Sequence, residues 1–206
     1  EDFRTLVKTA HENDIYVILD WVPNHTGWDH SWIKTNPEYY TQNEAGDIID
    51  PINPDTGESW GWQDVADLNY DNKEMRAEMI EDMLFWITQE NIDGFRCDVA
   101  SAVPLDFWKD AIAKLRAKKD IFMLAEAGEA NLVEGTELFD MVYGWDRHHV
   151  FNQMAKSEDA VSLWKESIKR DMNLYEADDI LMTFVTNHDE NSWNGTVRER
   201  MGDAAE

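Results

Sequence analysis

Four short apolar runs in this chain each end in acidic or imidazole residues, and this arrangement restricts the folds that the chain can adopt. In chain order the runs are Ile15 to His25, Ile92 to Ala100, Ile121 to Ala127 and Ile180 to Asn191. Nearly continuous apolar runs are typical of strands that are covered on both faces of a parallel sheet. Parallel strands bring their carboxyl ends to one edge of the sheet, where a β/α-barrel places its catalytic residues.

Segments with helical periodicity alternate with these runs, so the chain is predicted to form a parallel α/β domain. We expect helices at residues 1–13, 73–91, 104–118 and 158–172, and a fifth strand at residues 138–143. One stripe of the second helix is apolar and should pack in the core. It consists of Met75, Met79, Ile80, Met83, Leu84 and Ile87. Cys97 lies within an apolar run, and we expect it to be a small buried residue.

Five strands are fewer than the eight of a closed barrel. We therefore expect the incomplete central portion of a parallel (β/α)8 TIM barrel, with residues 1–24 and 73–206 in the barrel. Residues 25–72 show no sustained period, and a loop of this length inside a compact domain is normally functional or a small subdomain. A doubly wound open sheet is the alternative, but no glycine-rich phosphate loop follows any strand. Because the sequence does not begin with Met, we expect it to be a piece of a longer protein.

The charge of the chain disfavours anionic partners. Acidic residues outnumber basic residues 43 to 18, which gives a formal net charge of −25. Such a surface repels nucleic acids and anionic membranes, but it does not affect the binding of a neutral sugar. No apolar run approaches the ~20 residues of a transmembrane helix. A single cysteine excludes an intrachain disulfide and leaves the cellular compartment open.

Three acids follow the predicted strands, namely Asp98, Glu126 and Asp189. Carboxylates brought to one mouth repel each other, which raises the pKa of at least one while others stay ionised. One acid can then donate a proton while another attacks as a carboxylate, as glycosidic bond cleavage requires. Arg96 lies two residues before Asp98 and should point to the same side of the strand, where it would keep Asp98 ionised.

The motifs at these strand ends resemble the signature regions of the alpha-amylase family of retaining glycoside hydrolases. DWVPNH, GFRCDVA, MLAEA and FVTNHD resemble its four regions in order and spacing, and VADLN resembles a short motif near the end of its inserted domain. The resemblance implies that Asp98 is the nucleophile, oriented by Arg96, and that Glu126 is the general acid/base. It implies that Asp189 stabilises the transition state, and that the bond is cleaved with retention through a covalent glycosyl–Asp98 intermediate.

The resemblance also implies how the substrate is bound. His25 and His188 would hydrogen-bond the sugar in the cleaved subsite, and the substrate would be a starch-like alpha-glucan or a maltooligosaccharide. Ser101-Ala102 replaces a Lys-His pair of many amylases, so the chain looks more similar to neopullulanases, maltogenic amylases and starch-utilisation amylases. The alternatives are a transglycosidase or isomerase of the same family, and a non-catalytic relative that only binds carbohydrate.

The resemblance implies that residues 25–72 are a small inserted domain after the third barrel strand, and in this family such an inserted segment is often tied to the barrel by calcium. Asn24 and Asp67 match two positions that supply calcium ligands, and oxygen donors suit such a hard cation. A metal-free pair held by hydrogen bonds is the alternative. Asp20 is expected to be a buried structural acid beneath the site.

Ten tryptophans are many for 206 residues, and half of them lie in or just before the inserted segment. These five are Trp21, Trp28, Trp32, Trp60 and Trp62. Because sugar rings stack on aromatic faces, we expect one or two of them to contact glucose units, and Trp193 is a further candidate. The tryptophans predicted to lie on helices, and therefore in the core, are Trp86, Trp108 and Trp164. His148 and His149 match no motif and are expected to be structural.

Overall fold

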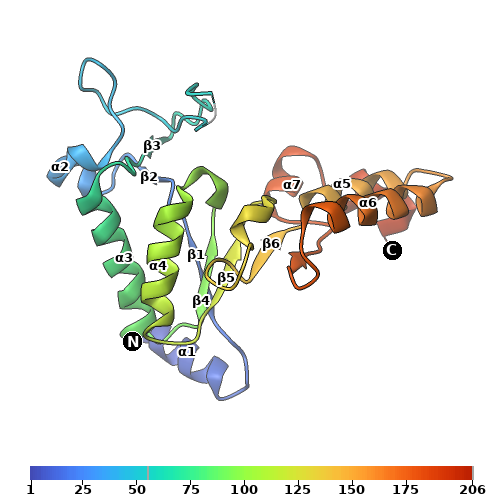
Figure 1. Cartoon of the computed structure of the whole chain (residues 1–206), viewed down its shortest axis with the longest axis horizontal. Helices are drawn as coiled ribbons and strands as arrows, with labels where there is room; N and C mark the ends of the chain where they lie inside the picture. The colour runs from blue at the N-terminus through green and yellow to red at the C-terminus, as the bar shows by residue number, and fades with distance from the viewer. Residues whose placement is uncertain (55, 206) are drawn as a thin grey trace.

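The computed structural model describes residues 1–54 and 56–205, and its main element is a five-stranded parallel sheet (Figure 1). The strands are β1 (Ile18–Trp21), β4 (Gly94–Cys97), β5 (Phe122–Ala125), β6 (Met141–Tyr143) and β7 (Leu181–Met182). Within this sheet, each strand pairs in parallel with the strand that follows it in the sheet order. The order β1-β4-β5-β6-β7 never reverses, as in a barrel and unlike a doubly wound sheet.

Helices connect the strands and pack in two groups. The longer helices are α1 (Asp2–His11), α3 (Lys73–Thr88), α4 (Leu105–Arg116), α5 (Trp145–Met154) and α6 (Ala160–Leu174), and the short ones are α2 (Trp32–Thr35), α7 (His188–Trp193) and α8 (Val197–Met201). Figure 1 shows α3 and α4 side by side next to β1, β4 and β5, and α5 and α6 packed together beyond β6. No helix among the described residues is both long and apolar enough to cross a membrane.

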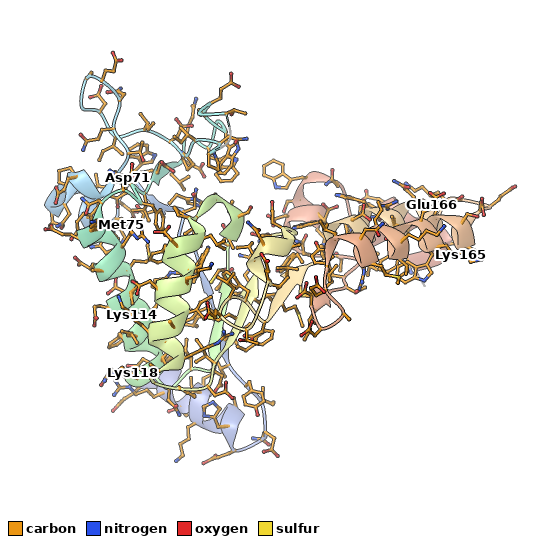
Figure 2. All side chains as sticks on the ribbon, viewed as in Figure 1. Asp71, Met75, Lys114, Lys118, Lys165 and Glu166 are labelled. Carbon is orange, nitrogen blue, oxygen red and sulfur yellow. The ribbon has the colours of Figure 1, made fainter. Side chains whose placement is uncertain are left out.

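The core lies between the sheet and helices α3 and α4. The predicted stripe of α3 is buried except for Leu84, which is half-buried against the same cluster. Met75, labelled in Figure 2, is fully buried at the start of this stripe, whereas Lys114 and Lys118 near the end of α4 are exposed. Cys97 has no exposed surface, as expected.

Gly94 is required by the close spacing of β4 and β5. Its φ of 150° is unfavourable for other residues, and an added Cβ would lie 1.8 Å from the carbonyl oxygen of Phe122. A side chain at this position would therefore push the two strands apart. These are the two strands after which Asp98 and Glu126 follow.

The strands are shorter than predicted, and one helix was not predicted. The first run was expected to be a strand from Ile15, but Ile15 and Tyr16 are exposed and β1 begins at Ile18. The last run forms a strand only at Leu181–Met182. Helix α5 was not predicted because its apolar residues do not form one stripe; it buries His148 and Val150.

The inserted segment contains an antiparallel pair, β2 (His25–Gly27) and β3 (Val65–Asp67). A short 3₁₀ helix, η1 (Pro37–Tyr39), lies between them in sequence. In Figure 1 the segment extends beyond the carboxyl end of β1. Its buried side chains are continuous with the main core, and they include Tyr39, Tyr40, Ala66 and Leu68. The segment therefore packs at the edge of the sheet where the acids lie.

Candidate active site

Asp98 and Glu126 follow neighbouring strands and lie side by side. β4 and β5 pair in register up to Cys97 and Ala125, so the next residue of each strand carries an acid. The N–H of Glu126 donates to the carbonyl of Cys97 at 2.9 Å, and the N–H of Asp98 donates to the carbonyl of Trp21 at 2.8 Å. The backbone ladder thus continues past the strands and fixes where both side chains start.

The guanidinium of Arg96 joins three acids from three strands. Its Nη1 donates to Oδ1 of Asp98 at 2.6 Å and to Oδ1 of Asp20 at 2.8 Å. Its Nη2 lies 2.7 Å from Oε1 of Glu126, an ion pair without hydrogen-bond geometry. A planar guanidinium can bridge carboxylates in this way, whereas a lysine ammonium is a single point charge.

Arg96 is held from a fourth strand as well. Its Nε donates to the hydroxyl of Tyr143 at 3.4 Å, and its guanidinium carbon lies 5.8 Å from the centre of the Tyr143 ring. The residue is 8% exposed. Burial alone would lower the pKa of Arg96, but its hydrogen bonds with Tyr143 and Asp20 and the charge of Glu126 raise it above the usual value. Arg96 is therefore a permanent positive charge among the acids.

Glu126 has the environment of a proton donor. Burial, together with the hydrogen bond and charge of Asp98, raises the pKa of Glu126 to about 7, although Arg96 and the Val99 amide oppose this change. That amide donates to Oε2 of Glu126 at 3.1 Å. Two adjacent carboxyl groups, one with a pKa near neutrality, can divide proton donation and nucleophilic attack between them.

Asp20 is not the buried acid that the sequence suggested. Its side chain is 59% exposed, although it bonds to Arg96. Within the described chain, β1 is an edge strand that pairs only with β4, so nothing covers this side chain from the other side. In the described chain, Asp20 is therefore a partner of Arg96 with an exposed side chain.

His25 lies close to the acids and to an aromatic pair. It is the first residue of β2, and its ring centre lies 5.7 Å from that of Trp62, which in turn lies 4.6 Å from the Trp60 ring. Burial lowers the pKa of His25, while the charges of Asp98 and Asp64 oppose this change. His25, Trp62 and Trp60 thus form a row of rings that begins near Asp98.

Asp189 and His188 lie in the first turn of α7. Their side chains are 42% and 70% exposed, and Oδ2 of Asp189 lies 3.4 Å from Nε2 of His188. Within the described part of the chain, neither forms a hydrogen bond or ion pair with Asp98 or Glu126. Direct contacts therefore join Asp98, Glu126 and Arg96, and Asp189 with His188 forms a second, separate pair.

The remaining tryptophans differ in exposure. Trp193, on α7, is 81% exposed, and Trp28 is 40% exposed with its indole N–H bonded to the carbonyl of Gln63. Trp108 is fully buried, as expected, and Trp86 is half-buried against the core. Trp164 is half-buried and stacks on Phe151 instead.

Asn24, just before the inserted segment, and Asp67, within it, are neighbouring buried oxygen donors. Asp67 pairs in register with His25, the residue after Asn24. Asn24 is 5% exposed and Asp67 is 6% exposed. Burial raises the pKa of Asp67 to about 6. No Lys, Arg or His of the described residues forms an ion pair with Asp67, and no cluster of three His, Cys, Asp or Glu in that part of the chain could hold a metal. The pair suits a hard cation completed by carbonyl or water oxygens.

Sequence reasoning missed three features of this site. Asp20 was not expected to bond Arg96, although strand register places the two opposite each other. Tyr143, the last residue of β6, was not singled out, and an aromatic residue at a strand end was the available signal. The Val99 amide could not be foreseen, because its contact with Glu126 depends on the pairing of β4 with β5.

The chain matches the family model described as alpha amylase, catalytic domain, over residues 1–203. It is 31% identical over 146 residues to alpha-amylase 3 of Dictyoglomus thermophilum. This match covers 61% of this chain and 29% of that protein. It is also 25% identical over 221 residues to the 4-alpha-glucanotransferase of Thermotoga neapolitana. That match covers 92% of this chain and 47% of that protein.

Among solved structures, the chain is similar to a maltogenic alpha-amylase from Thermotoga neapolitana. The TM-score is 0.80 at 32% sequence identity, and the match covers 91% of this chain and 42% of that chain. Because such amylases are TIM barrels, the five-stranded sheet is part of a barrel of this kind, as expected from the sequence. The chain spans less than half the length of each of these relatives.

Proposed function

The chain belongs to the alpha-amylase family, and we propose that it carries catalytic acids of an enzyme that hydrolyses α-glucosidic bonds of starch-like glucans with retention. The observation that supports this is the contact of one guanidinium, that of Arg96, with both Asp98 and Glu126. It sets two acids side by side, and one of them, Glu126, has a raised pKa, as a double-displacement reaction needs.

In the first step, Glu126 donates its proton to the glycosidic oxygen while a carboxylate oxygen of Asp98 attacks the anomeric carbon. The bond from that carbon to the leaving oxygen breaks, its electron pair takes up the proton, and an ester to Asp98 forms. With its pKa raised to about 7, about half of Glu126 still carries the proton at neutral pH. Arg96 orients Asp98 for this attack, because its Nη1 donates to Oδ1 of Asp98 at 2.6 Å.

In the second step, Glu126 acts as a base. It takes a proton from a water molecule, whose oxygen attacks the anomeric carbon and releases Asp98 as a carboxylate. Glu126 thereby regains the proton that it lost, and two inversions give net retention. This route expects a separation of about 5 to 5.5 Å between the two carboxyl groups.

Other residues would bind the sugar. His25 would donate to a hydroxyl of the cleaved unit, and the rings of Trp62 and Trp60 beside it would offer faces for neighbouring glucose units. Asp189 and His188 would contact the same unit from α7, where Asp189 stabilises the positive charge that develops on the ring.

A transferase is the second candidate, because the 4-alpha-glucanotransferase relative aligns with 92% of this chain. Such an enzyme would use the same covalent intermediate and exclude water in its second step. Incubation of the full-length protein with maltoheptaose separates the two functions. Shorter products alone indicate hydrolysis, whereas products longer than the substrate indicate transfer.

The proposed mechanism is tested on the full-length protein that contains these residues, as wild type and as Asp98→Asn. NMR of the first product released from starch or pullulan should show the α anomer for the wild type, and the variant should lose at least roughly 10⁴-fold in kcat. Release of the β anomer would indicate inversion, and full activity in Asp98→Asn would remove the proposed nucleophile.

We also propose that calcium is held by Asn24 and Asp67. Its positive charge would balance the buried carboxylate of Asp67 and tie the inserted segment to the end of β1, three residues before Asn24. Asn24 and Asp67 would supply two oxygens, and backbone carbonyls and water would complete the coordination shell.

A further inference from the structure

Helix α7 carries Asp189 and His188 but is too short to be stable by its own hydrogen bonds. It spans only His188–Trp193, and isolated helices shorter than about 12 residues are marginal in water. Asp189 is partly exposed, whereas the next residue, Glu190, is only 8% exposed. The orientation of the helix must therefore be fixed by contacts on its buried side, where Glu190 lies.

Glu190 occupies a position at which a glutamate usually caps its own helix. The side chain of Asn187 accepts a hydrogen bond from the Glu190 N–H at 2.7 Å, so Glu190 is the third helical residue. In a capping box its carboxylate would bond back to the N-cap amide. Helix α8 forms that box, because Oε2 of Glu199 accepts from the N–H of Thr196 at 2.7 Å.

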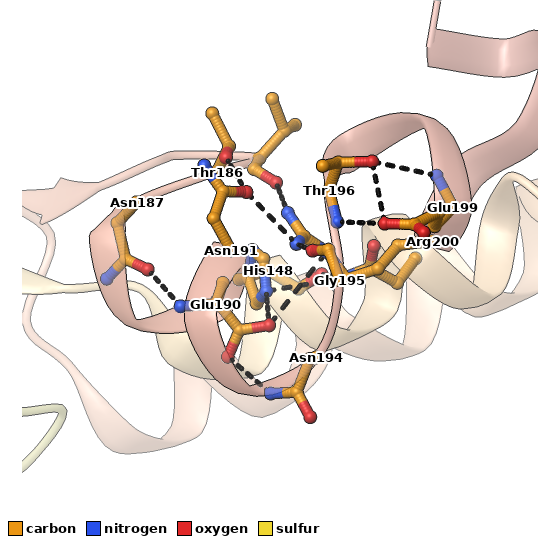
Figure 3. Close-up of polar contacts among 12 residues, drawn as sticks. His148, Thr186, Asn187, Glu190, Asn191, Asn194, Gly195, Thr196, Glu199 and Arg200 are labelled. Carbon is orange, nitrogen blue, oxygen red and sulfur yellow. Dashed lines mark hydrogen bonds and ion pairs between the residues drawn. The ribbon is translucent and has the colours of Figure 1, made fainter.

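In α7 the carboxylate instead reaches across to another helix. Oε2 of Glu190 lies 3.0 Å from Nε2 of His148 on α5 and 3.9 Å from Nε of Arg200 on α8, and Oε1 accepts from Asn194 (Figure 3). Burial alone would raise the pKa of Glu190, but the hydrogen bond and charge of His148 outweigh it and lower the pKa. Glu190 therefore connects α7 with α5 and α8 as an anion.

His148 is held rigidly on its other side. It has no exposed surface, and its ring stacks on Phe184 with 4.6 Å between centres and 8° between planes. Its Nδ1 lies 3.3 Å from the carbonyl oxygen of Phe184, and Nε2 also approaches the amide of Asn152 at 3.1 Å. The two ring nitrogens of His148 therefore face the carbonyl of Phe184 on one side and the carboxylate of Glu190 on the other.

Arg200 holds the segment that leads into α7. Its Nη2 donates to the carbonyl of Val185 at 2.6 Å, and Nη1 donates to the carbonyl of Gly195. His148 and Arg200 thus contact the backbone at residues 184 and 185, between β7 and α7, as well as the carboxylate of Glu190. The side chains of His148 and Arg200 therefore hold both the segment that leads into α7 and the helix itself.

We propose that Glu190, held by His148 and Arg200, is a positioning residue that sets the orientation of α7 and thereby the placement of Asp189 at the sugar. This inference rests on the proposed function of Asp189. Small displacements of a catalytic group, of about 1 Å, can reduce the rate about 100-fold. Loss of the Glu190 charge should therefore act on kcat through Asp189.

The test compares Glu190→Gln with Glu199→Gln in the full-length protein. Each change removes the carboxylate at the third position of a helix, Glu190 in α7 and Glu199 in α8. Only Glu190 contacts His148. We expect kcat per active site, counted by covalent trapping with a mechanism-based inhibitor, to fall about 10- to 100-fold in Glu190→Gln. KM should change little, and Glu199→Gln should stay within about two-fold of the wild type.

A double variant shows whether the effect passes through Asp189. In an Asp189→Asn background, Glu190→Gln should cause little further loss, because the group that it positions is already disabled. The proposal is overturned if the two losses multiply in full. It is also overturned if kcat per active site is unchanged while only the melting temperature falls.

Hydrogen exchange separates a failure of this inference from a failure of the proposed function. If the wild type turns over no glucan, the proposed function fails whatever the variants do. Faster exchange of the amides of residues 188–193 in Glu190→Gln, but not in Glu199→Gln, would then still support the role of Glu190 in holding α7. Unchanged exchange at these amides would overturn it.

Discussion

The backbone N–H of Val99 donates to Oε2 of Glu126 at 3.1 Å while Val99 holds a left-handed conformation, with φ 42° and ψ 44°. A β-branched residue in this region costs on the order of 1–3 kcal/mol. Val99 directly follows Asp98, so one residue both supplies the amide that contacts the proposed acid and starts the strained turn after the proposed nucleophile.

Replacing Val99 with glycine tests whether this strain is real. Glycine adopts positive φ readily, so we expect Val99→Gly to raise the free energy of unfolding by about 1 kcal/mol despite its larger entropy in the unfolded chain. Ala102→Gly is the control, because Ala102 lies in the same 3₁₀ turn without a positive φ and should lose up to about 1 kcal/mol. Urea unfolding measures both; equal destabilisation would contradict the strain.

Arg96 should not tolerate replacement by lysine. A lysine ammonium cannot contact Asp98 and Glu126 through separate nitrogens as the guanidinium does, so we expect Arg96→Lys to lose about 100-fold in kcat.

Replacement of Arg96 by methionine leaves the acids without a cation. Arg96→Met should destabilise the fold by about 3 kcal/mol at neutral pH and by less at pH 4, where the acids take up protons. Asp20→Asn serves as the control and should cost below about 1 kcal/mol, because Asp20 is mostly exposed. Assays and urea unfolding at both pH values measure these effects.

The pKa of Glu126 predicts two pH dependences. Because only the protonated form can donate to the leaving group, kcat/KM should fall as the pH rises above about 7. The folded state also keeps this proton between the ordinary pKa of 4.5 and about 7, while the unfolded state loses it, so stability should fall as the pH rises through this window. In Glu126→Gln the free energy of unfolding should no longer show this fall between pH 4.5 and about 7, which unfolding curves at several pH values would measure. The same pH dependence in the wild type and the variant would contradict the raised pKa.

Much of the fold followed from local patterns, but the site depends on pairings that sequence does not record. The alternation of apolar runs and helices led to the parallel sheet, and the spacing of Arg96 and Asp98 placed both on one side of β4. The contact of Arg96 with Asp20 depends on the register between β1 and β4. A one-residue shift would turn one of these side chains to the other face.

The exposure of Asp20 shows a second limit. An acid in a nearly continuous apolar run suggests burial, but exposure depends on which strands cover it, and β1 is an edge strand in the described chain. Likewise, the tertiary role of Glu190 was hidden, because Asn187 and Glu190 have the spacing of an ordinary helix cap. Local sequence cannot tell whether such a carboxylate bonds its own helix or a distant histidine.

Removal of calcium gives the last prediction. If Asn24 and Asp67 hold the ion, a chelator should lower the melting temperature of the wild type by several degrees, because an ion that binds only the folded state stabilises it. Asp67→Asn should start at a lower melting temperature and respond little to the chelator. If no cation binds there, the same substitution removes an uncompensated buried charge and should raise stability instead. Thermal unfolding with and without added calcium, with Asp71→Asn on the exposed surface as the control, distinguishes the two by the sign of the change.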